Sequence, residues 1–281
     1  MAKGIIFDIK EFTIQDGPGI RITVFFKGCS LRCQWCHNPE GLSFEPELMV
    51  RESSCIHCGK CRIGCGHAEC KSFSRCLKIC PLGLVKAVGA GFDSSELAVK
   101  LKMYQDFIKI NQGGITLSGG EPLAQPEFLI DLLRELKPLH TAVETSGYSS
   151  QQLFRQVAEL ADLILFDIKH TNPQVHRQYT GVDNEPILKN LDLLIKMGKK
   201  FIARVPLIPG VNDSAENMEN TAILLRNASG LERVELMPYN LFAGAKYTVV
   251  GKKYAPSFNE KAEVCIFKEV FEKHDIKCSV L

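Results

Sequence analysis

The sequence predicts an α/β fold: an incomplete barrel of six strand–helix units, written (β/α)6, that carries a small cysteine-rich insert. From Asp93 onward, short apolar runs alternate with longer helical patterns, and this alternation is typical of a mostly parallel sheet with right-handed crossovers. Six units are too few to close an eight-stranded barrel. In addition, ten of the 12 cysteines lie between Cys29 and Cys80, which predicts metal sites in the first third of the chain.

Strands are expected where short apolar runs occur, and helices where apolar residues recur with a period near 3.6. The expected strands are Ile20–Phe26, Ile115–Ser118, Thr141–Glu144, Leu163–Ile168, Phe201–Leu207 and Arg233–Pro238. The expected helices are Ser94–Lys109, Gln125–Leu136, Gln151–Leu160, Ile187–Lys196, Glu216–Asn227 and Glu260–Lys273. Because active sites in parallel barrels form at the carboxyl ends of the strands, the polar residues that follow the first three strands are expected to meet there.

Composition and charge argue against several classes of function. The 281 residues are 45% hydrophobic and carry a net charge of +2, with Lys and Arg spread along the chain. This distribution does not indicate binding to nucleic acid or to an anionic membrane. No apolar run has the length of a signal peptide or a membrane span, so we expect a soluble, cytoplasmic protein. In a reducing compartment, closely spaced cysteines indicate metal sites rather than disulfides.

Residues 52–82 are predicted to form the insert, between barrel segments 1–51 and 83–281. This stretch holds seven cysteines and few long apolar residues, and about 30 residues cannot bury enough surface to fold without a metal or another staple. The run Cys55-x2-Cys58-x2-Cys61-x3-Cys65 has the bacterial ferredoxin spacing. A second run with the same spacing occupies positions 70, 73, 76 and 80, but Phe73 stands in one ligand place.

In a two-cluster ferredoxin the fourth cysteine of each run binds the other cluster. One complete 4Fe–4S cluster is therefore expected on Cys55, Cys58, Cys61 and Cys80. The second site has only Cys65, Cys70 and Cys76. It could hold a three-iron cluster or a four-iron cluster with a ligand such as His67 or Glu69, or it could be absent. Whether the insert relays electrons, docks a partner or serves as a structural staple is left open. Cys265, in the expected terminal helix, and Cys278, in a last strand or tail, are expected to be buried thiols without a redox role.

The first cysteine group, Cys29-x3-Cys33-x2-Cys36, has a different spacing. Three thiolates on one loop can hold three corners of a 4Fe–4S cluster and leave the fourth iron open, whereas an electron-transfer cluster normally has all four corners bound by protein. An open iron can bind and reduce a substrate. The alternative is a zinc knuckle with His37 as the fourth ligand.

A second motif, Ser118-Gly119-Gly120-Glu121-Pro122, follows an expected strand and opens a helix. Paired glycines let a small ligand approach the backbone, and exposed N–H groups there can bind its polar edge. Taken alone, the motif could equally be a simple strand-to-helix turn.

Together, the cysteine group and the glycine motif resemble those of the radical S-adenosylmethionine (SAM) superfamily. In that family C-x3-C-x-aromatic-C carries the cluster, with Trp35 here in the aromatic place, and Gly119, Gly120 and Glu121 belong to the motif that approaches the SAM amino group. The resemblance implies that SAM chelates the open iron. Reductive cleavage then gives methionine and a 5′-deoxyadenosyl radical.

Three further segments resemble those of glycyl radical enzyme activating enzymes: Asp16-Gly-Pro-Gly-Ile-Arg21, Gly28–Cys33 and Cys36–Glu40. The resemblance covers essentially the whole chain outside the insert. It implies that the radical abstracts a Cα hydrogen from a glycine of a partner enzyme, with reduced flavodoxin or ferredoxin as the electron donor. The insert resembles those of activating enzymes that serve decarboxylases, dehydratases, and C–N or C–S lyases.

The same resemblance implies roles for further residues. Glu144 stands where the family has Asp, and with Asp167 and Lys169 it marks a possible monovalent cation site beside SAM. Arg204, expected at the end of the fifth barrel strand, is an expected SAM contact, and Asn240 is expected to hydrogen-bond adenine or ribose. Asp167, Lys169 and Arg204 could instead form a supporting salt-bridge cluster. Two other functions are weighed: a radical SAM enzyme acting on a small molecule or peptide, and a ferredoxin-type electron carrier or zinc-binding module.

Overall fold

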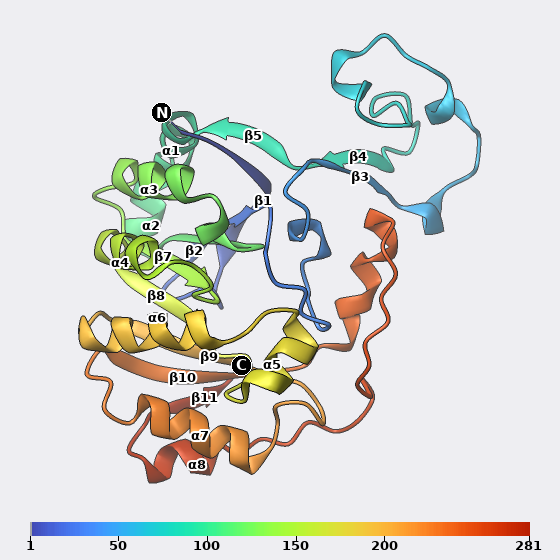
Figure 1. The fold of residues 1–281 in the computed structure, drawn as a ribbon. Coiled ribbons are helices and arrows are strands. Elements are labelled where there is room, and N and C mark those ends of the chain that lie inside the picture. Colours follow the sequence, from blue (N-terminus) through green and yellow to red (C-terminus); the bar gives the residue numbers. More distant parts are fainter. Residues whose placement is uncertain (1) are drawn as a thin grey trace.

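A single mixed sheet organises the chain in the computed structural model, which describes residues 2–281 (Figure 1). Its nine strands lie in the order β11 (Cys278–Val280), β10 (Leu231–Pro238), β9 (Phe201–Leu207), β8 (Leu163–Asp167), β7 (Thr141–Thr145), β6 (Gly114–Gly119), β2 (Arg21–Phe26), β1 (Lys3–Thr13) and β5 (Ala90–Asp93). Neighbours from β2 to β11 are parallel, whereas β1 is antiparallel to both β2 and β5. The sheet has two unpaired edges, β5 and β11, within the described residues, so it stays open, as predicted for an incomplete barrel.

Helices cover the outer face of the sheet, except α5, which lies at the open end of the barrel (Figure 1). They are α1 (Ser94–Lys102), α2 (Gln105–Ile110), α3 (Pro126–Glu135), α4 (Gln151–Leu160), α5 (Pro173–Thr180), α6 (Glu185–Lys196), α7 (Ala215–Leu225) and α8 (Lys268–Lys273). Helix α4 illustrates why they form: Ser150 caps its first turn by accepting the Leu153 N–H, and Phe154, Val157 and Ala158 face the core at helical spacing. No helix among residues 2–281 is long and apolar enough to span a bilayer.

The barrel strands have different chemistry on their two faces. Along β2, Ile22, Val24 and Phe26 belong to the apolar core under the helices, and Phe26 packs on Phe128 of α3. The alternate residues of β2, β6, β9 and β10 point to the barrel interior, because side chains alternate along a strand. Several of these are polar and fully or largely buried: Arg21, Thr23, Thr116, Ser118, Arg204 and Glu235. The interior is therefore a polar wall that ends at the site described below.

A two-stranded antiparallel ribbon, β3 (Glu47–Val50) and β4 (Val85–Val88), leaves the barrel after β2. It carries the loop 51–84, which stands away from the barrel (Figure 1). This loop contains only short 3-10 turns: η2 (Glu52–Ser54), η3 (Lys60–Arg62) and η4 (Ala68–Cys70). The predicted insert, 52–82, lies within it.

Two predicted helices are wrong in extent. The helix expected over Ser94–Lys109 is divided into α1 and α2 at Met103 and Tyr104. The helix expected over Glu260–Lys273 is confined to α8, because residues 261–267 are mostly exposed and give a helix little to pack against. Asp213 also accepts the Cys265 N–H at 3.0 Å, which binds that backbone to the barrel instead. Strands β1, β3, β4 and β5 and helix α5 were not among the expected elements, whereas β11 is the last strand that was expected, as a strand or tail, at Cys278.

The prediction for Cys265 is wrong as well: its thiol lies outside a helix and is exposed. Cys278 lies in β11 and is half-buried, and burial raises its pKa to about 11. That thiol is therefore neutral near pH 7.

Arg21 joins the N-terminal turn to the barrel from a fully buried position. Its Nε donates to Thr116 Oγ1 at 2.6 Å, and its terminal nitrogens donate to the carbonyls of Ile115 (2.9 Å) and Pro18 (3.1 Å). Burial lowers its pKa to about 10, against the opposing charge of Asp16, so the guanidinium stays charged at neutral pH.

We predict that Arg21→Met lowers the free energy of unfolding by about 2–4 kcal/mol, because it leaves these buried acceptors without a donor. Denaturant unfolding under anaerobic conditions measures the loss. Arg155→Met, on the exposed side of α4, is the matched control and should change stability by less than about 0.5 kcal/mol. Equal stabilities for the two variants would contradict the anchoring role.

Candidate active site

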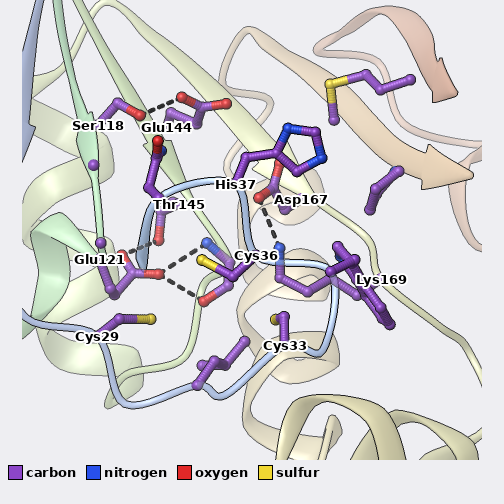
Figure 2. Close-up of a pocket in the computed structure, with 18 residues that line it drawn as sticks. Cys29, Cys33, Cys36, His37, Ser118, Glu121, Glu144, Thr145, Asp167 and Lys169 are labelled. Carbon is purple, nitrogen blue, oxygen red and sulfur yellow. Dashed lines mark hydrogen bonds and ion pairs between the residues drawn. The ribbon is translucent and has the colours of Figure 1, made fainter. Parts of the chain in front are cut away.

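A cavity lies at the carboxyl ends of β2, β6, β7 and β8, where the sequence predicted that polar residues meet (Figure 2). Ten of the predicted site residues line it: Cys29, Cys33, Trp35, Cys36, Gly119, Gly120, Glu121, Glu144, Asp167 and Lys169. The thiols of the three cysteines converge from one loop (Figure 2). Two predicted residues, Arg204 and Asn240, are not among its lining residues.

The cysteine loop is held in place by α5, an element that was not expected. Arg32 and Gln34 donate their backbone N–H groups to the carbonyls of Thr180 (2.7 Å) and Tyr179 (3.0 Å). Trp35 is buried with Ile208 and Phe258, and its ring lies 6.4 Å from that of Tyr179. The aromatic position between the second and third cysteines thus anchors the loop and also lines the cavity.

Burial keeps the cysteine thiols neutral before they bind metal. It raises the pKa of Cys29 and Cys33 to about 12 and that of Cys36 to about 11. For Cys29 the Glu121 carboxylate adds to the effect. A metal must therefore displace protons when it binds here. Among the described residues, these thiols and His37 do not form a group with all ligand atoms within 4.8 Å of one another, which does not favour the zinc knuckle.

The glycine turn packs directly on the cysteine loop. The N–H groups of Gly120 and Glu121 donate to the carbonyls of Phe26 (2.8 Å) and Gly28 (2.9 Å). A Cβ at Gly120 would lie 2.4 Å from the Gly28 carbonyl oxygen, and Gly119 has a φ of +115°, so both positions favour glycine. The expectation that these N–H groups are exposed to a ligand is therefore wrong for Gly120 and Glu121, because they hold two protein segments together.

Glu121 is the side chain that links the turn to β7. One carboxylate oxygen accepts the Thr145 hydroxyl (2.6 Å) and the Leu123 N–H (3.2 Å). The other accepts the N–H (2.9 Å) and hydroxyl (2.6 Å) of Ser146. Figure 2 shows the contact of Glu121 with Thr145. Burial raises the pKa of Glu121, and these four hydrogen bonds oppose that rise by favouring the carboxylate.

Glu144 and Arg204 form an ion pair in the barrel interior, in which Arg204 is buried and Glu144 is partly exposed. Arg204 donates to Glu144 at 2.6 Å, to Glu235 at 2.9 Å, and to the Gln15 carbonyl. It lies in the middle of β9 rather than at its end. The other oxygen of Glu144 accepts the Ser118 hydroxyl. Burial raises the pKa of Glu144, but Arg204 outweighs it and the net pKa is lowered; Arg204 itself is held fully charged.

Asp167 and Lys169 form a second pair beside the cysteines, with Lys169 Nζ 2.9 Å from Asp167 Oδ2. Burial alone lowers the pKa of Lys169, but Asp167 and the thiols of Cys33 and Cys29 raise it above its ordinary value. The pKa of Asp167 is raised by burial in spite of Lys169. Its Oδ1 is buried and has no hydrogen-bond partner within the described chain. Asp167 therefore offers a free oxygen that can accept a hydrogen bond or bind a cation.

Asn240 lies farther out: its side chain is exposed and accepts the Phe242 N–H at 2.9 Å, which begins the 3-10 turn η6 (Leu241–Lys246). Its expected contact with adenine or ribose stays a prediction.

Several residues that line the cavity were not predicted to have a role, above all Ser146, which binds Glu121, and Met237 near the end of β10. A polar residue directly after a strand was the available signal for Ser146. The partnership of Ser146 with Glu121, 25 residues away, carries no local signal.

The loop 51–84 groups its cysteines in two sets. Cys55, Cys58, Cys61 and Cys80 line one cavity together with Arg75. Cys65, Cys70 and Cys76 lie with His67, their ligand atoms all within 4.8 Å of one another. Glu69, the other ligand considered for this site, is exposed and paired with Lys78 instead.

Comparison with known proteins identifies the family to which the chain belongs. The sequence model of the radical SAM superfamily matches residues 23–222, which include the cysteine loop and most of the barrel. The choline trimethylamine-lyase activating enzyme of Oleidesulfovibrio alaskensis is 36% identical, over 99% of this chain and 98% of that protein. The (2S)-3-sulfopropanediol dehydratase activating enzyme of Klebsiella oxytoca is 34% identical, over 96% and 91%.

The chain belongs to the radical SAM superfamily, among the glycyl radical enzyme activating enzymes. It is therefore an enzyme of radical SAM type, and membership implies SAM and a 4Fe–4S cluster held by cysteines. The solved structure of a radical SAM methyltransferase from Sphaerobacter thermophilus shares the fold, with a TM-score of 0.53 at 15% identity over 98% of this chain and 76% of that one. The electron-carrier and zinc-module alternatives are excluded by this membership.

For this radical SAM protein we predict that Glu121→Gln lowers formation of 5′-deoxyadenosine at subsaturating SAM by about 10- to 100-fold while iron content stays unchanged. The NH2 group of the new Gln side chain would face N–H and O–H donors and could not accept their hydrogen bonds. Each buried polar group that is left unpaired destabilises the site by about 1–3 kcal/mol. An anaerobic assay with dithionite measures the product.

Ser146→Ala, which removes one of the four donors, should have a smaller effect, and Cys33→Ala should give no product. A wild-type rate for Glu121→Gln would show that the carboxylate does not organise the cavity.

Proposed function

We propose that this chain installs a glycyl radical in a separate partner enzyme of the decarboxylase, dehydratase, or C–N or C–S lyase class, using SAM bound in the cavity at the cysteine loop. The observation that carries the proposal is that one cavity brings together the three thiols, the Gly119–Gly120 turn and the Asp167–Lys169 pair. The two relatives described above, named as activating enzymes of a lyase and a dehydratase, support the partner class.

The residues that line the cavity fit a 4Fe–4S cluster and SAM. Cys29, Cys33 and Cys36 supply three sulfur ligands from one loop, and no fourth cysteine lines the cavity in the described chain. When bound, the reduced cluster and SAM supply a one-electron cleavage that releases methionine and gives a carbon radical able to take a glycine Cα hydrogen. The chain itself holds the loop against the Gly119–Gly120 turn and surrounds it with buried groups that limit water.

The charged residues of the wall then have different roles. Both oxygens of Glu144 are already bound, to Arg204 and to Ser118, so Glu144 and Arg204 support the site rather than contact SAM directly. Asp167 Oδ1 is free, and we assign to it a positive group of SAM or a monovalent cation. Lys169 lies close enough to Cys29 and Cys33 to offset the negative charge of their thiolates.

In the insert, we propose that Cys55, Cys58, Cys61 and Cys80 hold one auxiliary 4Fe–4S cluster. The cavity that they share supports this, as does the spacing of the first run. Reduced flavodoxin or ferredoxin is the proposed electron donor.

We predict that anaerobic incubation of the reduced protein and SAM with a glycyl radical enzyme from the same organism produces an organic radical signal in the partner by electron paramagnetic resonance. The captodative glycyl radical is stable enough to accumulate because its electron is delocalised over the flanking amides. Cys33→Ala should abolish the signal, because it removes a cluster ligand.

Cys265→Ala is the matched control, since its thiol is exposed and outside the cavity, and it should leave the signal unchanged. Wild-type SAM cleavage without any partner radical, across the glycyl radical enzymes of that organism, would contradict the proposed substrate and favour a small molecule or a peptide.

A further inference from the structure

The second cysteine set of the insert differs from the sites that are expected to hold clusters. Cys65, His67, Cys70 and Cys76 place one ligand atom each within 4.8 Å of all the others, and Cys76 Sγ lies 3.6 Å from His67 Nδ1. Neither Cys29, Cys33 and Cys36 nor Cys55, Cys58, Cys61 and Cys80 form such a group within residues 2–281. The insert therefore contains two kinds of donor arrangement.

The spacing of these four donors fits one metal ion better than a cluster. Around a tetrahedral zinc ion, with bonds of about 2.3 Å to sulfur and 2.0–2.1 Å to nitrogen, neighbouring donors lie about 3.6–3.8 Å apart, and no two can be farther apart than about 4.6 Å. In a four-iron cluster each thiolate binds a different iron, which spreads the donors more widely.

The surroundings of these four residues are those of a structural metal site, which holds a loop in one conformation. Within residues 51–84, Cys70 and Cys76 are the only buried side chains. The backbone closes around them: Leu77 N–H points to Cys70 Sγ at 3.4 Å, and Cys76 N–H donates to the Cys61 carbonyl at 2.7 Å. A loop with so little apolar burial needs a cross-link to keep one structure, and a closed four-coordinate ion provides one.

The other close-set group in the described chain, Glu52, Cys55 and His57, lacks these features. It has three donors, none of them buried, and Glu52 is already paired with Arg75 at 2.9 Å. The group of Cys65, His67, Cys70 and Cys76 is therefore the better candidate for a metal site.

We propose that Cys65, His67, Cys70 and Cys76 bind a single tetrahedral zinc ion, so that the second site of the insert is mononuclear and redox-inactive. Three thiolates and one imidazole are a donor set of structural zinc sites, and Zn²⁺ binds nitrogen and sulfur ligands more tightly than Fe²⁺. The insert then contains one electron-carrying site, at Cys55, Cys58, Cys61 and Cys80, and one structural zinc site. This inference is independent of which partner the enzyme activates.

The test is metal analysis of the full-length protein, purified anaerobically from cells supplied with both iron and zinc. We expect about one zinc ion and about eight iron ions per chain, the iron from two 4Fe–4S clusters. X-ray absorption at the zinc edge should show three sulfur ligands and one nitrogen ligand. About twelve iron ions without zinc, or zinc bound mainly by oxygen, would overturn the proposal.

Variants assign the ion to these residues. His67→Ala should lower zinc affinity by more than about 100-fold, because loss of even an outer partner of a metal site costs 10- to 100-fold. Glu69→Ala, an exposed neighbour outside the set, is the matched control and should keep the zinc, and Cys58→Ala should lose about four iron ions and keep the zinc.

If His67→Ala does not fold, His67→Cys keeps four ligands and should change the zinc environment from three sulfurs and a nitrogen to four sulfurs. A zinc environment that is the same in His67→Cys as in the wild type would overturn the assignment. SAM cleavage, measured on the same samples, is a separate readout of the Cys29, Cys33 and Cys36 site.

Discussion

The site depends on a backbone contact that only glycine permits. The Gly28 N–H donates to the Gly41 carbonyl, and the Gly120 and Glu121 N–H groups donate to the carbonyls of Phe26 and Gly28. These bonds bring the cysteine loop, which follows β2, against the turn that follows β6. Any Cβ at Gly120 would collide with the carbonyl oxygens of both Gly28 and Gly41, 2.4 Å away. Because Cys29 directly follows Gly28, the position of the first cluster ligand is set by this contact.

Of the carboxylates around this contact, Glu121 and Glu144 have hydrogen-bond partners at both oxygens, whereas Asp167 has a partner at only one. Glu121 accepts four hydrogen bonds, and Glu144 is bound at both oxygens by Arg204 and Ser118. Such buried groups hold the ends of the strands in one arrangement, because breaking any of the pairs would leave an uncompensated buried charge. Asp167 keeps one free oxygen at the cavity. The wall is thus rigid where it supports the loop and open where a ligand or cation can bind.

The barrel strands and the cysteine and glycine motifs could be predicted from the sequence, because they depend on local patterns of residues. The six barrel strands are short, mostly buried apolar runs, and the cysteine and glycine motifs follow two of them, β2 and β6. Helix α5 also had readable signals, since Asn172 caps it, Pro173 begins it and Gly181 ends it, but it has little apolar periodicity. The partners of Glu121 and Arg204 could not be predicted, because contacts between distant segments leave no trace in local pattern. His67 was weighed as a ligand beside Cys65, Cys70 and Cys76 because it lies in the same short stretch of sequence. The terminal helix was overpredicted for a related reason: Asp213, far along the chain, takes up the Cys265 N–H.

The most direct test of the account follows one hydrogen atom. A partner glycyl radical enzyme is labelled with deuterium at its glycine Cα positions and incubated anaerobically with this protein, reductant and SAM. Mass spectrometry then measures deuterium in the 5′-deoxyadenosine product. The account predicts incorporation of one deuterium per product molecule, lost when the acceptor glycine of the partner is changed to alanine. Product that carries no deuterium, formed while the partner stays free of radical, would contradict hydrogen abstraction from a partner glycine.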